Sequence, residues 1–464
     1  MEKPKMRIEH DLLGEMPVEA SCLYGIHTLR AVRNFPVTGN PISIYPELIN
    51  ALASVKQACA EANHSFGLLP DVKAAAIIKA CEQLRAGHHH NAFVVDVIQG
   101  GAGTSTNMNA NEVVANLGLL SLGKEPGEYG SLHPLEDVNM SQSTNDVYPT
   151  AIRIALNFEI LKLYDAMGIL IIAFDKKAHE FGHYLKVGRT QLQDAVPMTL
   201  GQEFSTYSVM LQEDQQRLLE ASRLIKEINL GATAIGTGIN APSGFAAVAC
   251  QHLSAITGLQ LVTAQNLVEA TQDAGAFVQL SGVLKRIAVK LSKTCNDLRL
   301  LSSGPRAGFG EITLPAVQAG SSIMPGKVNP VIPEVVNQIA FDVIGKDMTI
   351  TMAAEGGQLQ LNAFEPIITK NLMDSLTYLR QGCLILAEKC VNGITANPER
   401  LAQLFENSIT TVTALNTVIG YEKATFVAKE AFRTHKSVKE VLLANQLLTE
   451  TQIDELFSIH NLIK

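Results

Sequence analysis

The chain has 464 residues, of which 47% are hydrophobic and 18% charged, so it is long enough to bury a core and to form more than one domain. The formal net charge of −8 argues against the strongly basic surfaces that bind nucleic acid or anionic membranes. An anionic substrate would therefore have to be attracted by local donors rather than by the overall field of the protein.

Membrane and secretion signals are not evident in the sequence. No apolar run reaches about 18 residues, and no apolar segment of signal-peptide length follows the first residues. The seven cysteines are scattered, odd in number and free of CxxC pairs, which is typical of reduced, buried thiols. We therefore expect a cytoplasmic protein without membrane spans.

In chain order, the first predicted elements are short. Glycines and prolines interrupt residues 1–45, which predicts β-like pieces and turns rather than a long helix. Two alanine-rich helices are predicted next, from Pro46 to His64 and from Pro70 to Ala86, each opened by a proline. The run His88-His89-His90 is a poor metal site, because adjacent side chains on a helix point in different directions.

A glycine-rich polar loop at 99–107 leads into a helix predicted from Met108 to Leu122, with a threonine or an asparagine available as its N-cap. The loop is not a dinucleotide fingerprint, because that motif needs glycine where Thr106 stands and a βαβ context that is not evident. Exposed amides at the start of this helix would instead suit a carboxylate.

Long helices separated by polar loops dominate the rest of the chain. A loop at 141–149 precedes a helix predicted from Thr150 to about Gly182, and a loop at 188–197 precedes one from about Met198 to Asn229. A glycine-threonine turn at 231–238 is followed by helices at about 264–301, from about Pro333, and from about Pro366 to Gly393. Helices this long, apolar on more than one side, pack within a bundle or an oligomer.

These elements predict a mainly α fold, in which an elongated helical bundle is flanked by two smaller domains. The predicted domains are an N-terminal mixed and helical domain at 1–145, a central long-helix domain at 146–397, and a small C-terminal helical domain at 398–464. Long helices with two apolar faces also predict a homo-oligomer.

Four loops share a composition that favours anion binding. The loops at 99–107, 141–146, 188–197 and 320–330 are rich in small and neutral polar residues, and Lys327 and Arg189 add positive charge. Cys/His metal spacings and the GxSxG and HExxH motifs are absent from the sequence. A Walker loop is excluded as well, because Gly320 and Gly326 are too far apart and Val328 follows Lys327.

A site of this kind can recognise a small polycarboxylate and stabilise extra negative charge placed on it. Such charge forms when a base removes a proton next to a carboxylate and generates a dianionic enediolate. The base must lie within hydrogen-bond reach of the acidic carbon. Ser321 is a candidate if backbone amides and an ammonium stabilise its alkoxide. The alternative interpretation is that 320–330 is a helix-to-helix connection with a solvated lysine.

A resemblance to the fumarase/aspartase superfamily rests on four segments in the right order. They are Gly103-Thr104-Ser105, Ser143-Thr144-Asn145, Gly188-Arg189-Thr190 and the signature-like run Gly320-Ser321-Ser322-Ile323-Met324-Pro325-Gly326-Lys327-Val328-Asn329-Pro330. The match is collinear over essentially the whole chain, from Tyr24 to Tyr421. The residues around 318–338 and at 349–362 are more similar to the aspartase branch of the superfamily than to fumarases.

The resemblance implies a three-domain fumarase/aspartase-like fold whose long central helices form a bundle of about 20 helices in a homotetramer. Each active site would combine loops from three subunits. The implied reaction is the reversible anti-elimination of ammonia from L-aspartate to give fumarate. The implied partners are small dicarboxylate or amino-acid substrates and further copies of this chain. No cofactor is implied as a requirement, and activation by Mg²⁺ is left open.

The resemblance also implies a role for each matched site residue, and none of them is a metal ligand. Ser321 would be the base that takes the Cβ proton. The β-carboxylate would be held, as it becomes the enediolate, by Thr104, Ser143, Thr144 and Ser322. The α-carboxylate would be bound by Lys327, Thr190 and Asn329, and the amino group by Asn145 with help from Gln191.

Gln191 departs from much of the superfamily, which carries a histidine there, paired with a glutamate at the position of Glu334. Glutamine cannot deliver a proton at about pH 7, and a leaving hydroxide needs one, whereas an ammonium substituent can depart as neutral ammonia. The residue therefore favours loss of ammonia over loss of water. A class II-type fumarate hydratase is the alternative function, and a structural protein recruited from the superfamily is a third.

Overall fold

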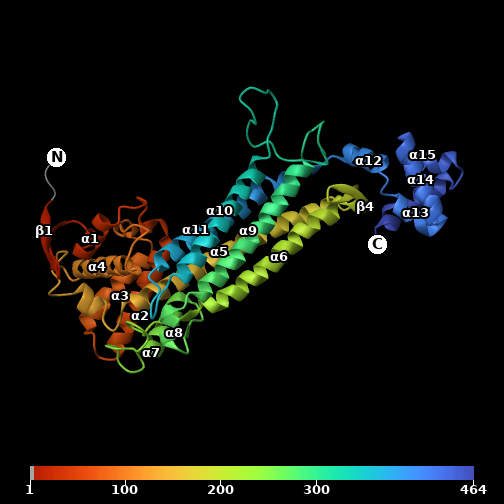
Figure 1. The fold of residues 1–464 in the computed structure, drawn as a ribbon. Coiled ribbons are helices and arrows are strands. Elements are labelled where there is room, and N and C mark those ends of the chain that lie inside the picture. The colour runs from red at the N-terminus through yellow and green to blue at the C-terminus, as the bar shows by residue number, and fades with distance from the viewer. Residues whose placement is uncertain (1–4, 464) are drawn as a thin grey trace. The chain divides into compact units, whose positions relative to one another are not determined.

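The computed structural model describes residues 5–463, and its internal contacts divide the chain into two compact units. Unit 1 comprises Met1–Tyr164, Gln216–Arg286 and Asp342–Leu379, and unit 2 comprises Asp165–Gln215, Ile287–Phe341 and Arg380–Lys464. Helices form most of the ribbon in Figure 1, and the described strands occur only as two-stranded pairs. The predicted mainly α fold class is therefore confirmed.

Helices of moderate length pack together in unit 1. α2 (Pro46–Ser65) lies against α3 (Asp71–Arg85) and α7 (Phe245–Thr257), and α3 lies against α4 (Thr104–Ser121) (Figure 1). Most residues of α2 are buried, and Pro46 occupies its first turn, where its missing N–H costs nothing. The two helices predicted to open with prolines are thus confirmed.

Short elements precede and link these helices, as predicted for residues 1–45. β1 (Met6–Asp11) pairs antiparallel with β2 (Gly14–Glu19), and α1 (Ile26–Asn34) and the 3₁₀ turn η1 (Ile42–Ile44) follow. The turn η2 (His90–Ala92) lies between α3 and α4, and the π-helical η3 (Pro134–Val138) follows α4. The buried Glu112 on α4 accepts hydrogen bonds from Gly25 N at 2.8 Å and Thr28 Oγ1 at 2.6 Å, which fixes the start of α1 on α4.

The long helices are α5 (Thr144–Glu180), α6 (Leu200–Ile225), α9 (Gly275–Leu301), α10 (Val331–Glu355) and α11 (Glu365–Lys389), and each contributes residues to both units. Buried polar contacts join them within each unit. In unit 1, Ser281 Oγ on α9 donates to Asp347 Oδ1 on α10 at 2.7 Å. In unit 2, Asn337 Nδ2 on α10 donates to Ser292 Oγ on α9 at 2.9 Å. The bundle of long helices predicted from the sequence is present.

Two helices begin earlier than predicted. α4 begins at Thr104 rather than Met108, and its N-cap residue is Gly103 rather than a threonine or an asparagine. α5 begins at Thr144 rather than Thr150 and contains Pro149. Pro149 has no N–H to donate to the carbonyl of Asn145, four residues earlier in the helix. Asn229 Nδ2 donates to this carbonyl instead, at 3.0 Å. A distant side chain therefore permits the early start.

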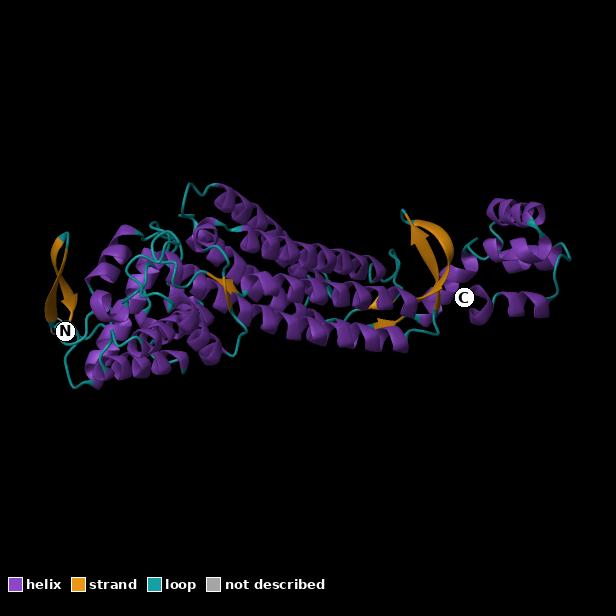
Figure 2. Ribbon diagram, turned by 90° about the horizontal axis from the view of Figure 1, so that it is seen from below, coloured by secondary structure: helices purple, strands orange, loops and turns teal. Residues whose placement is uncertain are grey.

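Two other predictions are wrong. The single helix predicted at 264–301 is broken into α8 (Leu267–Gln272) and α9, because Asp273 Oδ2 accepts from Gly275 N at 2.9 Å and turns the chain. The predicted loop at 188–197 is instead a hairpin of β3 (Leu185–Thr190) and β4 (Gln193–Thr199), drawn as the curved orange pair near the C label in Figure 2. α7 has no counterpart among the predicted elements.

The remaining elements are short. β5 (Glu227–Ile228) pairs parallel with β6 (Val262–Thr263), β7 (Ile312–Thr313) pairs antiparallel with β8 (Thr395–Ala396), and η4 (Val391–Gly393) precedes β8. The C-terminal helices are α12 (Pro398–Asn407), α13 (Val412–Ile419), α14 (Tyr421–Thr434), α15 (Val438–Ala444), α16 (Glu450–Leu456) and α17 (Ile459–Leu462). Of these helices, α13 to α16 bury a hydrophobic cluster of their own that includes Leu415, Val427, Leu442 and Ile453.

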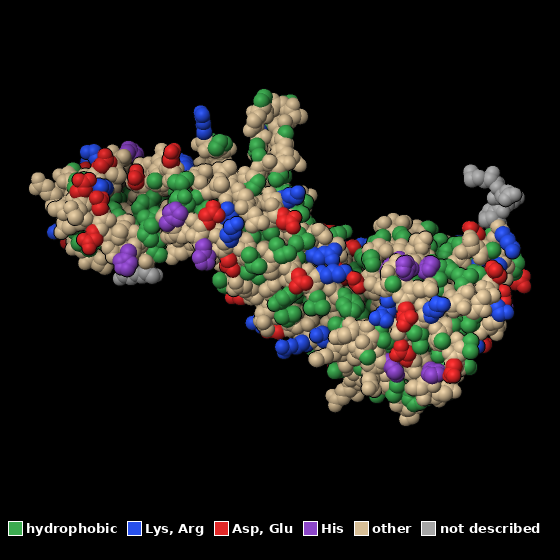
Figure 3. Space-filling model, turned by 180° about the vertical axis from the view of Figure 1, so that it is seen from behind, with side chains coloured by type: hydrophobic (Ala, Val, Ile, Leu, Met, Phe, Trp, Pro, Cys, Tyr) green, Lys and Arg blue, Asp and Glu red, His purple; other side chains and the backbone are tan. Residues whose placement is uncertain are grey.

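The described residues also bear on membrane spans, thiols and surface charge. Within residues 5–463, no helix is long and apolar enough to cross a membrane. All seven cysteines are free thiols; Cys22 is half-buried and the others are buried. On the face shown in Figure 3, acidic and basic side chains are interspersed.

Candidate active site

Thr104 lies at the first position of α4, after a glycine-rich turn. Its Oγ1 donates to Gly101 O at 2.7 Å, and the side chain is exposed. Gly103, which precedes it, has φ +88°, and a Cβ there would lie 2.2 Å from the ring of the buried Tyr148. Only glycine allows this backbone to approach α5 so closely. The turn therefore holds the N-terminus of α4 against α5.

The Ser143–Asn145 segment forms the start of α5 in the same unit. Asn107 Nδ2 on α4 donates to Thr144 Oγ1 at 3.1 Å, so the first turns of α4 and α5 meet. Because its oxygen accepts from Asn107, the Thr144 hydroxyl keeps its own proton for a ligand. Ser143 Oγ accepts from Asn145 N at 3.3 Å. Two helix N-termini that meet in this way offer partial positive charge to a carboxylate.

The Asn145 side chain is oriented by a segment that lies far away in the sequence. Its Nδ2 donates to Ala234 O at 2.8 Å, in the turn that follows β5. With the nitrogen engaged, Oδ1 is the end of the amide available to a ligand, and an amide oxygen can only accept hydrogen bonds. An ammonium group, which can only donate, complements this end of Asn145.

Two buried ionisable residues, which sequence reasoning missed, support this half of the site. Lys56 on α2 donates to Asn139 Oδ1 at 3.0 Å and to Gln142 Oε1 at 2.9 Å, and burial lowers the pKa of its ammonium to about 8. Asp146 follows Asn145, and burial raises the pKa of its carboxyl to about 6 although backbone hydrogen bonds oppose the change. Both Lys56 partners and the Gly231 partner of Asp146 lie 83 or more residues away in the sequence, so no local motif signals these contacts.

In unit 2, the loop at 320–330 is closed at its base. Gly320 N donates to Lys327 O at 2.8 Å, and Asn329 Nδ2 donates to Gly320 O at 2.8 Å. A Cβ at Gly320 would lie 2.7 Å from Lys327 O, so this crossing also needs glycine. The residues between Gly320 and Asn329, apart from the half-buried Ser321, are exposed.

Ser321 occupies a distinctive position in this loop. Its Oγ accepts hydrogen bonds from Ile323 N at 3.2 Å and from Met324 N at 2.9 Å. Hydrogen bonds donated to an oxygen stabilise its anionic form. Ser321 therefore has backbone amides around its oxygen, which is one of the two features that a serine base needs, and its assignment as the base stays a prediction. Ser322 and Lys327 lie exposed in the same loop.

Thr190 and Gln191 lie at the tip of the β3–β4 hairpin, also in unit 2. Thr190 pairs with Gln193, which leaves Gln191 and Leu192 as a two-residue turn with φ +53° and +62°. Both residues are in the left-handed region that such tight hairpin turns require. The preceding Arg189 donates to Glu311 Oε1 at 2.5 Å and lies 4.3 Å from the Phe309 ring centroid, so its positive charge is paired.

The predicted site residues thus fall into two groups. Unit 1 holds Thr104, Ser143, Thr144 and Asn145, and unit 2 holds Thr190, Gln191, Ser321, Ser322, Lys327 and Asn329. No cluster of three or more His, Cys, Asp or Glu side chains that could hold a metal is found among residues 5–463, and the His88–His90 run is no exception.

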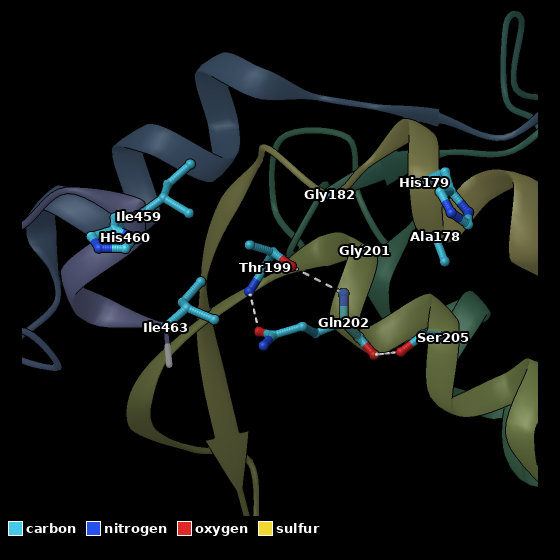
Figure 4. A pocket seen from close by; sticks show the side chains of 10 residues that line it. All are labelled: Ala178, His179, Gly182, Thr199, Gly201, Gln202, Ser205, Ile459, His460 and Ile463. Atoms are coloured by element: carbon cyan, nitrogen blue, oxygen red, sulfur yellow. Dashed lines mark hydrogen bonds between the residues drawn. The ribbon is translucent and has the colours of Figure 1, made fainter.

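A cavity of about 780 Å³ in unit 2 contains none of the predicted site residues. Its lining, drawn in Figure 4, is Ala178, His179, Gly182, Thr199, Gly201, Gln202, Ser205, Ile459, His460 and Ile463. Gln202 is engaged with Thr199, and His179 and His460 stand apart across the opening. The first turn of α6 contributes Gly201 and Gln202 to this lining, but none of the candidate loops at 99–107, 141–146, 188–197 and 320–330 contributes a residue.

Known proteins resemble this chain over nearly its whole length. Residues 14–345 match a family described as Lyase, and residues 412–464 match the fumarase C C-terminus. An aspartate ammonia-lyase of Pseudomonas canavaninivorans is 57% identical over 98% of this chain and 97% of its own. A solved Brucella melitensis structure, described as fumarate lyase:delta crystallin bound to cobalt, has a TM-score of 0.96 and 54% identity, covering 97% of this chain and 98% of its own.

A class II fumarase from Schistosoma mansoni shares the fold at lower identity, with a TM-score of 0.91 and 33% identity over 97% of this chain and 98% of its own. The match of residues 14–345 to that family, together with the helical bundle and its polar loops, defines the class as a lyase. The chain belongs to the fumarase/aspartase superfamily, as its motifs implied.

Proposed function

We propose that this protein is an ammonia-lyase that converts L-aspartate reversibly into fumarate and ammonia. Ser321, as the alkoxide, takes a proton from Cβ, and the electron pair of that C–H bond is held as an enediolate on the β-carboxylate. The pair then forms the C=C bond while the C–N bond breaks. The ammonium group leaves as neutral ammonia, and the abstracted proton remains on Ser321 until it returns to solvent.

The observation that carries this proposal is the pair of backbone N–H groups on Ser321 Oγ. A free serine hydroxyl is far too weak a base for a carbon acid, so its alkoxide has to be stabilised by fixed donors. The amides of Ile323 and Met324 are such donors, at 3.2 and 2.9 Å. The side-chain ammonium of Lys327, which has no hydrogen bond or ion pair within the described chain, supplies a cation in the same loop.

The two carboxylates of aspartate are recognised by different groups in the proposal. The N-termini of α4 and α5, with Thr104, Ser143 and Thr144, receive the β-carboxylate, where the enediolate charge develops, and Ser322 joins them. Thr104 has to turn away from Gly101 O to take part. The α-carboxylate is bound by Lys327, Thr190 and Asn329. Charge-assisted hydrogen bonds to preorganised donors are the strongest contribution such a site can make.

In the proposal, Asn145 Oδ1 accepts a hydrogen bond from the substrate's amino group, and Gln191 assists in binding it. Both are neutral amides, so neither can protonate a leaving group at about pH 7. That composition suits an ammonium substituent, which needs no acid, and disfavours malate, whose hydroxide does. The high identity to an aspartate ammonia-lyase supports the same choice over the class II fumarase function.

We propose that the protein works as a homotetramer whose active sites each combine loops from three subunits. Support comes from α10, where Phe341, Met348 and Met352 are 62–68% exposed at helical spacing. Exposed apolar stripes of this kind are usually covered by a partner. Thr104 and the segment Ser143–Asn145 also belong to a different compact unit from the loop at 320–330.

The proposed chemistry consists of proton transfer and hydrogen-bond stabilisation, so it requires no bound cofactor, and activation by Mg²⁺ would be an addition to it. We also propose that the protein is cytoplasmic, as expected of a metabolic enzyme that acts on free aspartate.

The experiment that tests the function compares L-aspartate with L-malate as substrates. Fumarate absorbance and released ammonia are followed together, with D-aspartate as the matched control of opposite configuration. We expect equal amounts of fumarate and ammonia from L-aspartate, and turnover of L-malate lower by about a hundredfold or more. Faster fumarate formation from L-malate than from L-aspartate would instead establish the hydratase function.

A further inference from the structure

One buried carboxylate joins separate backbone segments beside Asn145. Asp146, in the first turn of α5, is fully buried. Its Oδ1 accepts from Ser143 N at 2.8 Å, and its Oδ2 accepts from Gly231 N at 2.9 Å and from Thr233 N at 3.0 Å. A single side chain therefore fastens the start of α5 to the turn at 231–234.

The turn at 231–234 is held in a conformation that it would not adopt freely. Thr233 has φ +56°, in the left-handed region that is unfavourable for a β-branched residue. Gly231 has φ +93°, and a Cβ there would lie 2.5 Å from Ala246 Cβ. Such strain persists only where the surroundings fix the backbone. The two hydrogen bonds to Asp146 Oδ2 provide that constraint.

The next residue of the turn orients the amide of Asn145. Ala234 O accepts from Asn145 Nδ2 at 2.8 Å, and the Asn145 backbone carbonyl is held by Asn229 Nδ2 at 3.0 Å. With its backbone and its side-chain nitrogen both fixed, Asn145 presents Oδ1. If the turn moved, the amide could rotate and offer a donor, which would repel an ammonium group.

We propose that Asp146 is a positioning residue that gives Asn145 its preference for an ammonium group. Asp146 clamps the turn at 231–234, and the Ala234 carbonyl then keeps Asn145 Oδ1 available as an acceptor. Asp146 does not touch the substrate itself. The inference rests on the proposed function and deepens it. It assigns to Asp146, which does not contact the substrate, the discrimination between a dicarboxylate that carries an amino group and one that does not.

The test uses Asp146→Asn, which keeps the size of the side chain but replaces an acceptor oxygen by a donor. The KM for L-aspartate is compared with the Ki for succinate, a dicarboxylate without an amino group. We expect the KM to rise about tenfold or more while the Ki for succinate rises much less, so that the ratio of KM to Ki increases. An unchanged ratio would overturn the inference.

Asp96→Asn is the matched control. Asp96 is likewise a buried carboxylate that accepts from backbone amides, those of Thr38 at 2.7 Å, Gly39 at 3.0 Å and Ile98 at 2.8 Å, but it has no contact with the turn at 231–234. Its replacement is expected to lower the thermal midpoint without changing the ratio of KM to Ki. An equal change of the ratio in both variants would mean a general loss of structure and would overturn the inference.

A double-mutant cycle with Asn145→Ala shows whether Asp146 acts through Asn145. In the Asn145→Ala background, Asp146→Asn should change the ratio no further, whereas a purely structural effect would be the same in both backgrounds and would refute the inference. If Asp146→Asn does not fold, Asp146→Glu, which keeps the charge but displaces the turn, takes its place with the same expectation. A wild-type protein that forms no fumarate from L-aspartate would overturn the proposed function itself, which is a different result.

Discussion

At the scale of a single residue, Gly103 shows how much the candidate site depends on close backbone approach. Its φ of +88° and the 2.2 Å separation of a Cβ from the Tyr148 ring leave no space for a methyl group. Tyr148 is 2% exposed and cannot move aside into solvent. We therefore predict that Gly103→Ala destabilises the protein by about 2–4 kcal/mol, from backbone strain plus overpacking, and shifts Thr104. Thermal unfolding midpoints and the KM for L-aspartate measure the two effects.

Gly101→Ala is the matched comparison for this prediction. Gly101 has nearly the same φ, +90°, but the nearest atom to its Cβ would be Thr104 Cβ at 3.8 Å, an ordinary contact. Its replacement should cost only the backbone strain, about 1–2 kcal/mol. Equal midpoints for the two variants would show that the approach of Gly103 to Tyr148 is not tight.

The role of Asn145 could be predicted from the sequence, but the orientation of its side-chain amide could not. The resemblance to the superfamily assigns Asn145 to the amino group, but it does not say which end of the amide faces the ligand. The hydrogen bond from Nδ2 to Ala234 O decides that question, and it joins residues 89 positions apart. Contacts of this range are invisible to spacing and periodicity.

At the scale of elements, the sequence was informative wherever local chemistry determines the structure. Pro46 and the alanine-rich stretches predicted α2 and α3 correctly, because proline suits a first helical turn and alanine favours helix throughout. The long helices were predicted from their apolar periodicity. The early start of α5 was not, because Pro149 normally breaks a helix and the compensating donor, Asn229, lies far along the chain.

The β3–β4 hairpin was missed for a related reason. Tight two-residue hairpin turns are usually recognised in a sequence by Asn-Gly or Asp-Gly, because these residues accept positive φ. Here the turn is Gln191-Leu192, both at positive φ, so the usual signal is absent. The strain is stored at a proposed substrate-binding residue, which is where backbone strain is often found. The candidate loops themselves were identified from composition, but their hydrogen-bonding partners were not.

At the scale of the whole molecule, the proposal that active sites are shared between subunits makes a direct prediction. Thr144 belongs to unit 1 and Ser321 to unit 2. If each site takes these groups from different subunits, mixed tetramers of Thr144→Ala and Ser321→Ala chains will contain some sites with neither substitution. We predict that dissociating and reassembling the two inactive variants together restores measurable turnover of L-aspartate.

Each variant reassembled alone is the control for this experiment and should stay inactive. Size-exclusion chromatography establishes that the mixed sample has the same assembly state as the parents. If the mixed sample is no more active than the separate variants, each site takes both groups from one chain, and the sharing of sites is wrong.

The proposed elimination of ammonia depends on Ser321 as the base. The most direct measurement is therefore the rate of fumarate formation from L-aspartate by Ser321→Ala, alongside wild type, with oligomeric state and thermal midpoint checked in parallel. Turnover is expected to fall by about a thousandfold while assembly and stability stay unchanged, because only the proton acceptor has been removed. Activity of an intact Ser321→Ala protein within about tenfold of wild type would contradict it.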